Sequence, residues 1–214
     1  MYVPSHFAET RPDALRRLIE HNPLGALVIN GPNGLDANHL PFELDEATGE
    51  HGILRGHVAR ANPVWKEAGD GAEVLVIFRA MDAYVSPNWY PSKHESHRQV
   101  PTWNYQVVNV HGKIRIMDDE NYVRGVVARL TRTHEPRVNA EKAWKMGDAP
   151  KEYIDAMLQA IVGIEIEITK IVGKSKLSQN REERDRVSAA QELEQRGQQA
   201  ISSAMLGCTG SGLI

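Results

Sequence analysis

Cysteine, long apolar runs and well-known nucleotide-binding motifs are scarce or missing in this sequence of 214 residues. The single cysteine, Cys208, excludes an internal disulfide and is typical of a protein from a reducing cytoplasm. No apolar run approaches the roughly 20 residues that cross a bilayer. The N-terminus lacks a basic segment followed by an apolar one, so we expect no signal peptide and no membrane association.

The sequence also lacks the signatures of several enzyme classes. It contains no Walker A loop, GxGxxG, HExxH or GxSxG motif, which removes the best-known phosphate, dinucleotide, zinc protease and hydrolase sites. The net charge of −3 argues against a broadly basic surface for nucleic acid. The tightest histidine pair, His94 and His97, matches no known zinc spacing and lies in a polar stretch, so we expect solvated side chains there.

The remaining composition is that of a folded domain, with 41% hydrophobic and 25% charged residues. The pattern predicts helices near residues 10–22, 59–69, 118–134, 149–161 and 180–205, with Asp118 and Asn180 as caps. Strands are predicted near 24–30, 36–44, 51–58, 73–78, 102–117 and 163–177. We expect an α+β fold, a small antiparallel barrel or sheet with peripheral helices. Residues 1–180 form its main domain, and 181–214 add a C-terminal helix and a flexible tail.

Four local features refine this prediction. The β-branched run at 73–78 predicts a strand buried on both faces, whereas 163–177 alternates as a half-exposed strand does. His111-Gly112-Lys113 is the candidate turn or bulge within the long strand. The polar stretch 92–99 is expected to be a loop.

Residues 83–105 are the most distinctive part of the chain. Two aromatic runs, YVSPNWY and VPTWNY, flank the polar stretch and supply flat apolar faces with hydrogen-bonding tips. That mixture suits a planar heteroaromatic ligand. The alternative is a hairpin whose aromatic side chains cap a β core.

Two further segments could bind an anion. In GHVARANPVW, Arg60 follows a strand and Asn62 opens a helix, and in VGKSKLSQN two lysines on one strand face precede small polar residues. The lysines could instead protect an exposed sheet edge. His39 and His57 are candidates for neutral hydrogen-bond donors to a ligand carbonyl or phosphate.

Six ordered motifs give the chain a family resemblance: MYVPSHF, HLPFEL, GHVARANPVW, YVSPNWY, VPTWNY and GKSKLSQNR. They resemble the FMN-binding negative transcriptional regulator family, often called PaiB-type. The resemblance implies an FMN-binding split β-barrel, built as a homodimer with flavin between the subunits. The segment FRAMD at 78–82 and the histidine-rich loop depart from the family pattern.

The resemblance and the residue chemistry together select the candidate FMN-binding residues. They are His39, His57, Arg60, Asn62, Tyr84, Ser86, Trp89, Tyr90, Thr102, Trp103, Tyr105, Lys174, Lys176, Ser178 and Gln179. No catalytic residue and no metal ligand is predicted.

Three functions remain open at this stage. The first, a repressor of transcription, comes from the resemblance, and DNA contact would need a basic face such as the arginine series 124, 129, 132 and 137. Such a series is more often a solvated helix surface. The second is an FMN-dependent oxidoreductase of a small molecule. The third is a scaffold that acts through protein contacts.

Overall fold

The computed structural model describes residues 1–207 and has α+β architecture. The chain forms two compact units, each built from separate stretches of sequence. Unit 1 contains Met1–Leu18, Arg79–Val108 and the chain from Val172 onward, and unit 2 contains Ile19–Phe78 and Asn109–Ile171. Cys208 and the predicted tail lie outside the described residues. The division into residues 1–180 and 181–214 stays a prediction.

Eight strands pair in an antiparallel manner in the described chain. They are β1 (Ala8–Glu9), β2 (Leu24–Gly31), β3 (Gly34–Pro41), β4 (Glu43–Asp45), β5 (Ile53–Ala59), β6 (Glu73–Val85), β7 (Thr102–Met117) and β8 (Ile161–Lys176).

Residues 1–207 also form seven α-helices and three short 3-10 helices. The α-helices are α1 (Pro12–His21), α2 (Val64–Glu67), α3 (Pro91–Ser96), α4 (Glu120–Val138), α5 (Lys151–Gln159), α6 (Glu183–Gln195) and α7 (Gln199–Gly207), and the 3-10 helices are η1 (Ser5–Phe7), η2 (Pro87–Trp89) and η3 (Met146–Asp148). No helix in residues 1–207 has the length and apolar composition needed to cross a membrane.

Unit 2 holds a sheet with the strand order β3-β2-β6-β7-β8-β5-β4. Strands β2 and β3 form a hairpin whose turn includes Gly34 at φ 100°, a conformation that favours glycine. Strand β3 lies at one end of the order and finishes at Pro41, in agreement with the edge position that Pro41 predicts. The helices α4 and α5 of this unit share a small apolar cluster of Val123, Ile154 and Leu158.

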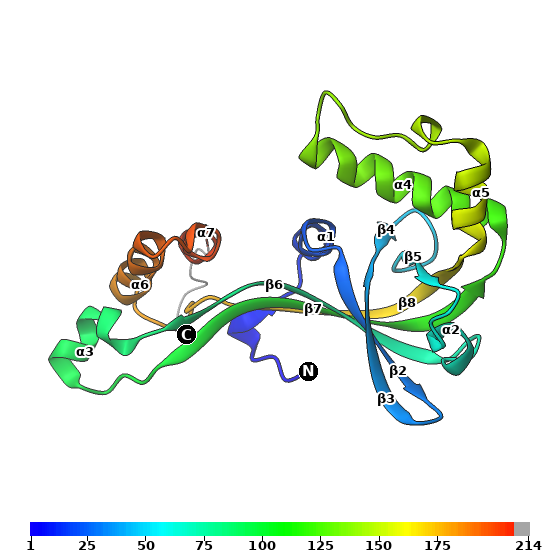
Figure 1. The fold of residues 1–214 in the computed structure, drawn as a ribbon. Helices are drawn as coiled ribbons and strands as arrows, with labels where there is room; N and C mark the ends of the chain where they lie inside the picture. Colours follow the sequence, from blue (N-terminus) through cyan, green and yellow to red (C-terminus); the bar gives the residue numbers. More distant parts are fainter. Residues whose placement is uncertain (208–214) are drawn as a thin grey trace. The chain divides into compact units, whose positions relative to one another are not determined.

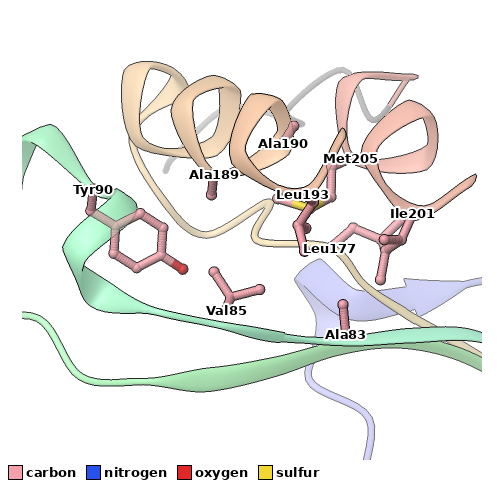
Figure 2. Close-up of a cluster of buried hydrophobic side chains, with 9 residues drawn as sticks. All are labelled: Ala83, Val85, Tyr90, Leu177, Ala189, Ala190, Leu193, Ile201 and Met205. Carbon is pink, nitrogen blue, oxygen red and sulfur yellow. The ribbon is translucent and has the colours of Figure 1, made fainter. Parts of the chain in front are cut away.

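Unit 1 is built from the far ends of β6, β7 and β8, with β1 paired to β8 through Ala8 and Lys174. Figure 1 shows α6 and α7 together over the end of these strands. Their buried face packs on an apolar cluster formed by Ala83, Val85, Tyr90, Leu177, Ala189, Ala190, Leu193, Ile201 and Met205 (Figure 2). One face of this part of the sheet is therefore committed to a core.

Most predicted elements are confirmed, and the differences have local causes. The segment 73–78 is wrong as a two-sided buried strand, because Val74, Val76 and Phe78 are buried while the residues between them are partly exposed. The turn at His111-Gly112-Lys113 is also wrong, since β7 continues through it. A Cβ at Gly112 would collide with the carbonyl oxygen of Glu167, so this glycine permits close approach of β8.

Three helix predictions also need correction. Part of the expected loop 92–99 is α3, which ends at His97 in the left-handed region with φ 54°. The cap of α4 is Asp119, whose side chain accepts a hydrogen bond of 2.8 Å from the Tyr122 amide. The helix predicted for 180–205 is two helices, separated near Gly197 at φ 78°, and the first begins without a side-chain cap from Asn180.

Candidate functional site

An exposed aromatic pair marks the sheet face of unit 1 opposite to the apolar cluster. Because Ala83 and Val85 point into that cluster, Tyr84 between them points to the other face. Trp103 precedes the buried Asn104 and lies on the same exposed face. The two rings are 5.9 Å apart in an edge-to-face arrangement, with Tyr84 48% and Trp103 53% exposed. Large rings left in water at this level offer a stacking surface.

Two lysines of β8 contact β7, the strand that carries Trp103. The Lys174 ammonium is 5.3 Å from the centre of the Tyr105 ring and donates to the Tyr2 carbonyl oxygen at 3.2 Å. The Lys176 ammonium donates to the Thr102 hydroxyl and, at 2.7 Å, to the Trp103 carbonyl oxygen. These positions join four predicted site residues to the aromatic pair, and we call the six residues Tyr84, Thr102, Trp103, Tyr105, Lys174 and Lys176 the aromatic face.

The electrostatics of the aromatic face favour an anion. Every hydrogen-bond acceptor that Lys174 and Lys176 contact in the described chain is neutral, and within residues 1–207 neither lysine pairs with a carboxylate. Burial lowers the pKa of Lys176 from the usual lysine value. A bound anion would neutralise both ammonium groups, so this face suits a planar aromatic ligand that carries negative charge.

The other predicted residues of the motif YVSPNWY have roles inside unit 1. The Ser86 hydroxyl accepts a hydrogen bond of 3.2 Å from the Asn88 amide and so caps η2. Trp89 packs under the guanidinium of Arg196, 4.7 Å from its ring centre. Tyr90 is fully buried, and Figure 2 shows its hydroxyl directed into the apolar cluster, where it has no hydrogen-bond partner among the described residues. The structure does not bring these three residues to the aromatic face.

The end of β8 is held by polar contacts on the covered side of the sheet. Ser178 is buried at φ 65° and its hydroxyl bonds Asn104 at 2.9 Å. Gln179 donates to the Ser175 carbonyl oxygen at 2.5 Å and accepts from the Leu177 amide at 2.7 Å. Ser178 and Gln179 therefore brace the strand end, and a ligand role for them stays a prediction.

A cleft of about 430 Å³ opens on this covered side of unit 1. Its polar lining includes Gln106, Ser175 and Gln179, and the Gln106 amide donates to the Ser175 hydroxyl at 2.9 Å. The sequence analysis missed Gln106 and Ser175. Neighbouring residues on a strand face opposite sides of the sheet. The positions of these two residues next to Tyr105 and between the two lysines therefore predict that they face the side opposite to the aromatic face.

The Arg60 turn of unit 2 is a closed network. The Arg60 guanidinium binds both Asp118 carboxylate oxygens at 2.9 and 2.6 Å, and it also donates to the carbonyl oxygens of Gln159 at 2.7 Å and Ile161 at 3.1 Å. The Asn62 side chain accepts from the Val64 amide at 2.9 Å, as predicted for a residue that caps α2, and donates to Asn38 at 2.7 Å. These contacts stabilise the turn, and the charge of the Arg60 guanidinium is compensated by Asp118.

The two predicted histidines also lie in unit 2. His39 is exposed on the edge strand β3. His57 lies on β5 opposite Gly163, and its buried Nδ1 has no hydrogen-bond partner among the described residues. Burial lowers the pKa of His57, so its imidazole is neutral near pH 7 and can act as the neutral group that was predicted. Its contact with a ligand stays a prediction.

Comparison with known proteins identifies the family of the chain. A family model described as "Putative FMN-binding domain" matches residues 1–170. The protein "Protease synthase and sporulation protein PAI 2" of Bacillus subtilis is 31% identical over 194 residues, which cover 91% of this chain and 89% of that protein.

Solved structures show the same fold at low sequence identity. The FAD and heme binding protein of Mycobacterium smegmatis is 17% identical with a TM-score of 0.55, and the match covers 79% of this chain and 73% of that one. The flavocytochrome Anf3 of Azotobacter vinelandii is 12% identical with a TM-score of 0.56, and the match covers 81% and 72% of the two chains. The fold is that of the flavin-binding split barrels, and the chain belongs to the FMN-binding, PaiB-type regulator family.

Proposed function

We propose that this protein binds FMN on the aromatic face and acts as a homodimeric negative regulator of transcription in the cytoplasm. The observation that carries the proposal is the exposed pair Tyr84 and Trp103, with Lys174 and Lys176 in contact with the strand that carries Trp103. The rings supply a stacking surface for isoalloxazine, and the ammonium groups supply the charge that a flavin phosphate needs. The family membership selects FMN among planar anions.

The same surface supports the proposed homodimer. Two large aromatic side chains remain about half exposed on the sheet of unit 1, and a second copy of the chain would cover them. A flavin held between two copies would have both ring faces buried. Sedimentation of the purified protein with and without FMN tests this part, and a monomer in both conditions would refute it.

The regulatory role rests on the family resemblance alone and needs its own test. Three arginines of α4 have protein partners: Arg124 pairs with Asp155 at 2.6 Å, Arg129 pairs with Glu43 at 2.6 Å, and Arg137 donates to the Glu20 carbonyl oxygen at 3.1 Å. The charges of Arg124 and Arg129 are compensated by these carboxylates, so both are poor phosphate ligands. Binding to promoter DNA at several salt concentrations decides whether contact is direct, because phosphate contacts produce a salt slope.

The first experiment is the visible spectrum of the purified protein, followed by an FMN titration monitored by quenching of flavin fluorescence. A yellow protein, or saturable quenching at about one FMN per chain, supports the proposal. Absence of both at micromolar FMN refutes the aromatic face as a flavin site. Consumption of NAD(P)H by the loaded protein would instead favour the oxidoreductase alternative.

A further inference from the structure

A second cavity lies wholly within unit 2, and the proposed function does not use it. It has a volume of about 300 Å³. The end of α1, the segment around β4 and the last turns of α4 enclose it. Its lining consists of Glu20, Pro23, Phe42, Glu43, Leu44, Leu130, Thr133, His134 and Arg137.

One face of α4 forms a wall of this cavity. Leu130, Thr133, His134 and Arg137 are spaced at i, i+3, i+4 and i+7, so they share a single helix face. Phe42 and Leu130 are buried at 2% and 8% exposure and give the cavity an apolar floor. Charged side chains and apolar side chains therefore line the same cavity, as in small-molecule sites.

The charges around the cavity have both signs. Arg137 uses one of its donors on the Glu20 carbonyl oxygen, at 3.1 Å, which leaves other donors of its guanidinium for a ligand. The Glu20 carboxylate has no ion-pair partner among residues 1–207, whereas the Glu43 carboxylate is held by Arg129 at 2.6 Å. His134 adds a polar group whose pKa is lowered by burial and by Arg137, so it is neutral near pH 7.

These charges select the class of ligand. A simple carboxylate would face the free Glu20 carboxylate, and a simple amine would face Arg137. A zwitterion satisfies both groups, because its carboxylate meets the guanidinium and its ammonium meets Glu20. The apolar side chains Phe42 and Leu130 favour a ligand with an aliphatic or aromatic side chain. The cavity volume of about 300 Å³ is at the small end of the range for ligand cavities.

We propose that this cavity binds a free α-amino acid with an apolar side chain, of about the size of leucine. The site gives the protein a second ligand besides flavin. It does not depend on the aromatic face, so the two proposals succeed or fail separately.

Isothermal titration of the full-length protein with L-leucine, with and without FMN, tests the proposal. We expect saturable binding at one site per chain in both conditions. L-leucinamide lacks the carboxylate, 4-methylpentanoate lacks the ammonium and glycine lacks the side chain. Each should bind at least about tenfold more weakly, since each leaves a charged or apolar group of the site without a partner.

Substitutions locate the binding site. Arg137→Gln and Glu20→Gln should each weaken leucine binding about tenfold, because each removes one charge of the pair that holds the zwitterion. Arg132→Gln is the matched control, since Arg132 lies on the same helix, is exposed and does not line the cavity, and it should leave binding unchanged. Circular dichroism verifies that every variant is folded.

Three results would overturn the proposal. They are no binding of leucine at millimolar concentration, equal binding of leucine and 4-methylpentanoate, and full leucine affinity in folded Arg137→Gln. Filling the cavity provides an independent arm, because Leu130→Phe should abolish leucine binding while FMN titration is unchanged. Loss of FMN binding with leucine binding intact would instead refute the proposed function alone.

Discussion

The Arg60 turn and the aromatic face both contain cations that could bind an anion, but the partners of these cations differ. Arg60 donates to a carboxylate and two carbonyl oxygens, and its charge is compensated by Asp118. Lys176 donates to a hydroxyl and a carbonyl oxygen, and its charge has no counterion in the described chain. A cation with a carboxylate partner fastens the fold, whereas a cation held by neutral acceptors remains available to a ligand. The comparison predicts that flavin affinity depends on the lysines and not on Arg60.

The largest effect should come from the stacking surface. Trp103→Ala removes the more exposed ring of the pair and should weaken FMN binding about 10- to 100-fold, as loss of a stacked aromatic does elsewhere. Fluorescence quenching of FMN measures it. Trp144→Ala is the matched control, since Trp144 is an exposed tryptophan of unit 2. Equal FMN affinity of Trp103→Ala and the parent protein would show that the aromatic face is not the flavin site.

Removal of one ammonium group should have the next largest effect. Lys176→Met keeps an apolar stem and loses the charge, and it should weaken FMN binding about tenfold, with a smaller dependence on salt. Lys176→Arg should retain most of the affinity. If Lys176→Met binds FMN as tightly as the parent at low salt, the flavin phosphate lies elsewhere.

The lowered pKa of Lys176 gives a pH dependence of several-fold at most. The ammonium loses its proton at a lower pH than an ordinary lysine does, so FMN affinity should fall as pH rises through that lowered pKa. Folding stability of the unliganded protein should rise in the same window, because the unfolded chain binds more protons there. Lys176→Arg should flatten both curves. A parent protein with constant FMN affinity across the alkaline range would exclude a role for this charge.

The smallest effect on flavin should come from Arg60→Gln, which we expect to change FMN affinity by no more than about twofold. Its effect should be on folding, with a lower melting temperature at neutral pH. Arg60 lowers the pKa of the Asp118 carboxyl, so the stability difference between parent and variant should vanish as pH falls through that lowered value. A large loss of FMN affinity with an unchanged melting temperature would show that Arg60 binds the ligand and does not stabilise the fold.

Local patterns predicted the elements of this fold because their signals lie within a few residues. The strand at 163–177 appears in the alternation of its isoleucines, and the α2 cap appears in Asn62-Pro63. Gly112 could not be interpreted in this way. Its reason lies in β8, where the carbonyl oxygen of Glu167 occupies the space of a side chain. A glycine that admits a distant strand has the same local signature as a glycine in a turn.

The candidate site was predictable to the same extent. Sequence alternation placed Lys174 and Lys176 on one strand face, and their contacts with Tyr105 and Thr102 agree with that placement. The fate of Arg60 was not predictable, since its partner Asp118 is 58 positions away and was expected to cap a helix. Tyr90 was chosen for its motif, but the approach of α6 and α7 buries it.

The interleaved path of the chain has a practical and evolutionary consequence. The chain passes between the two units after Leu18, Phe78, Val108 and Ile171, and three of these passages lie inside continuous strands. A fragment cut anywhere between them would leave each unit without part of its own sheet. Neither unit can therefore be expressed as one uninterrupted piece, or exchanged between genes by a single crossover. The two ligand sites proposed for this protein should therefore be gained or lost together with the whole domain.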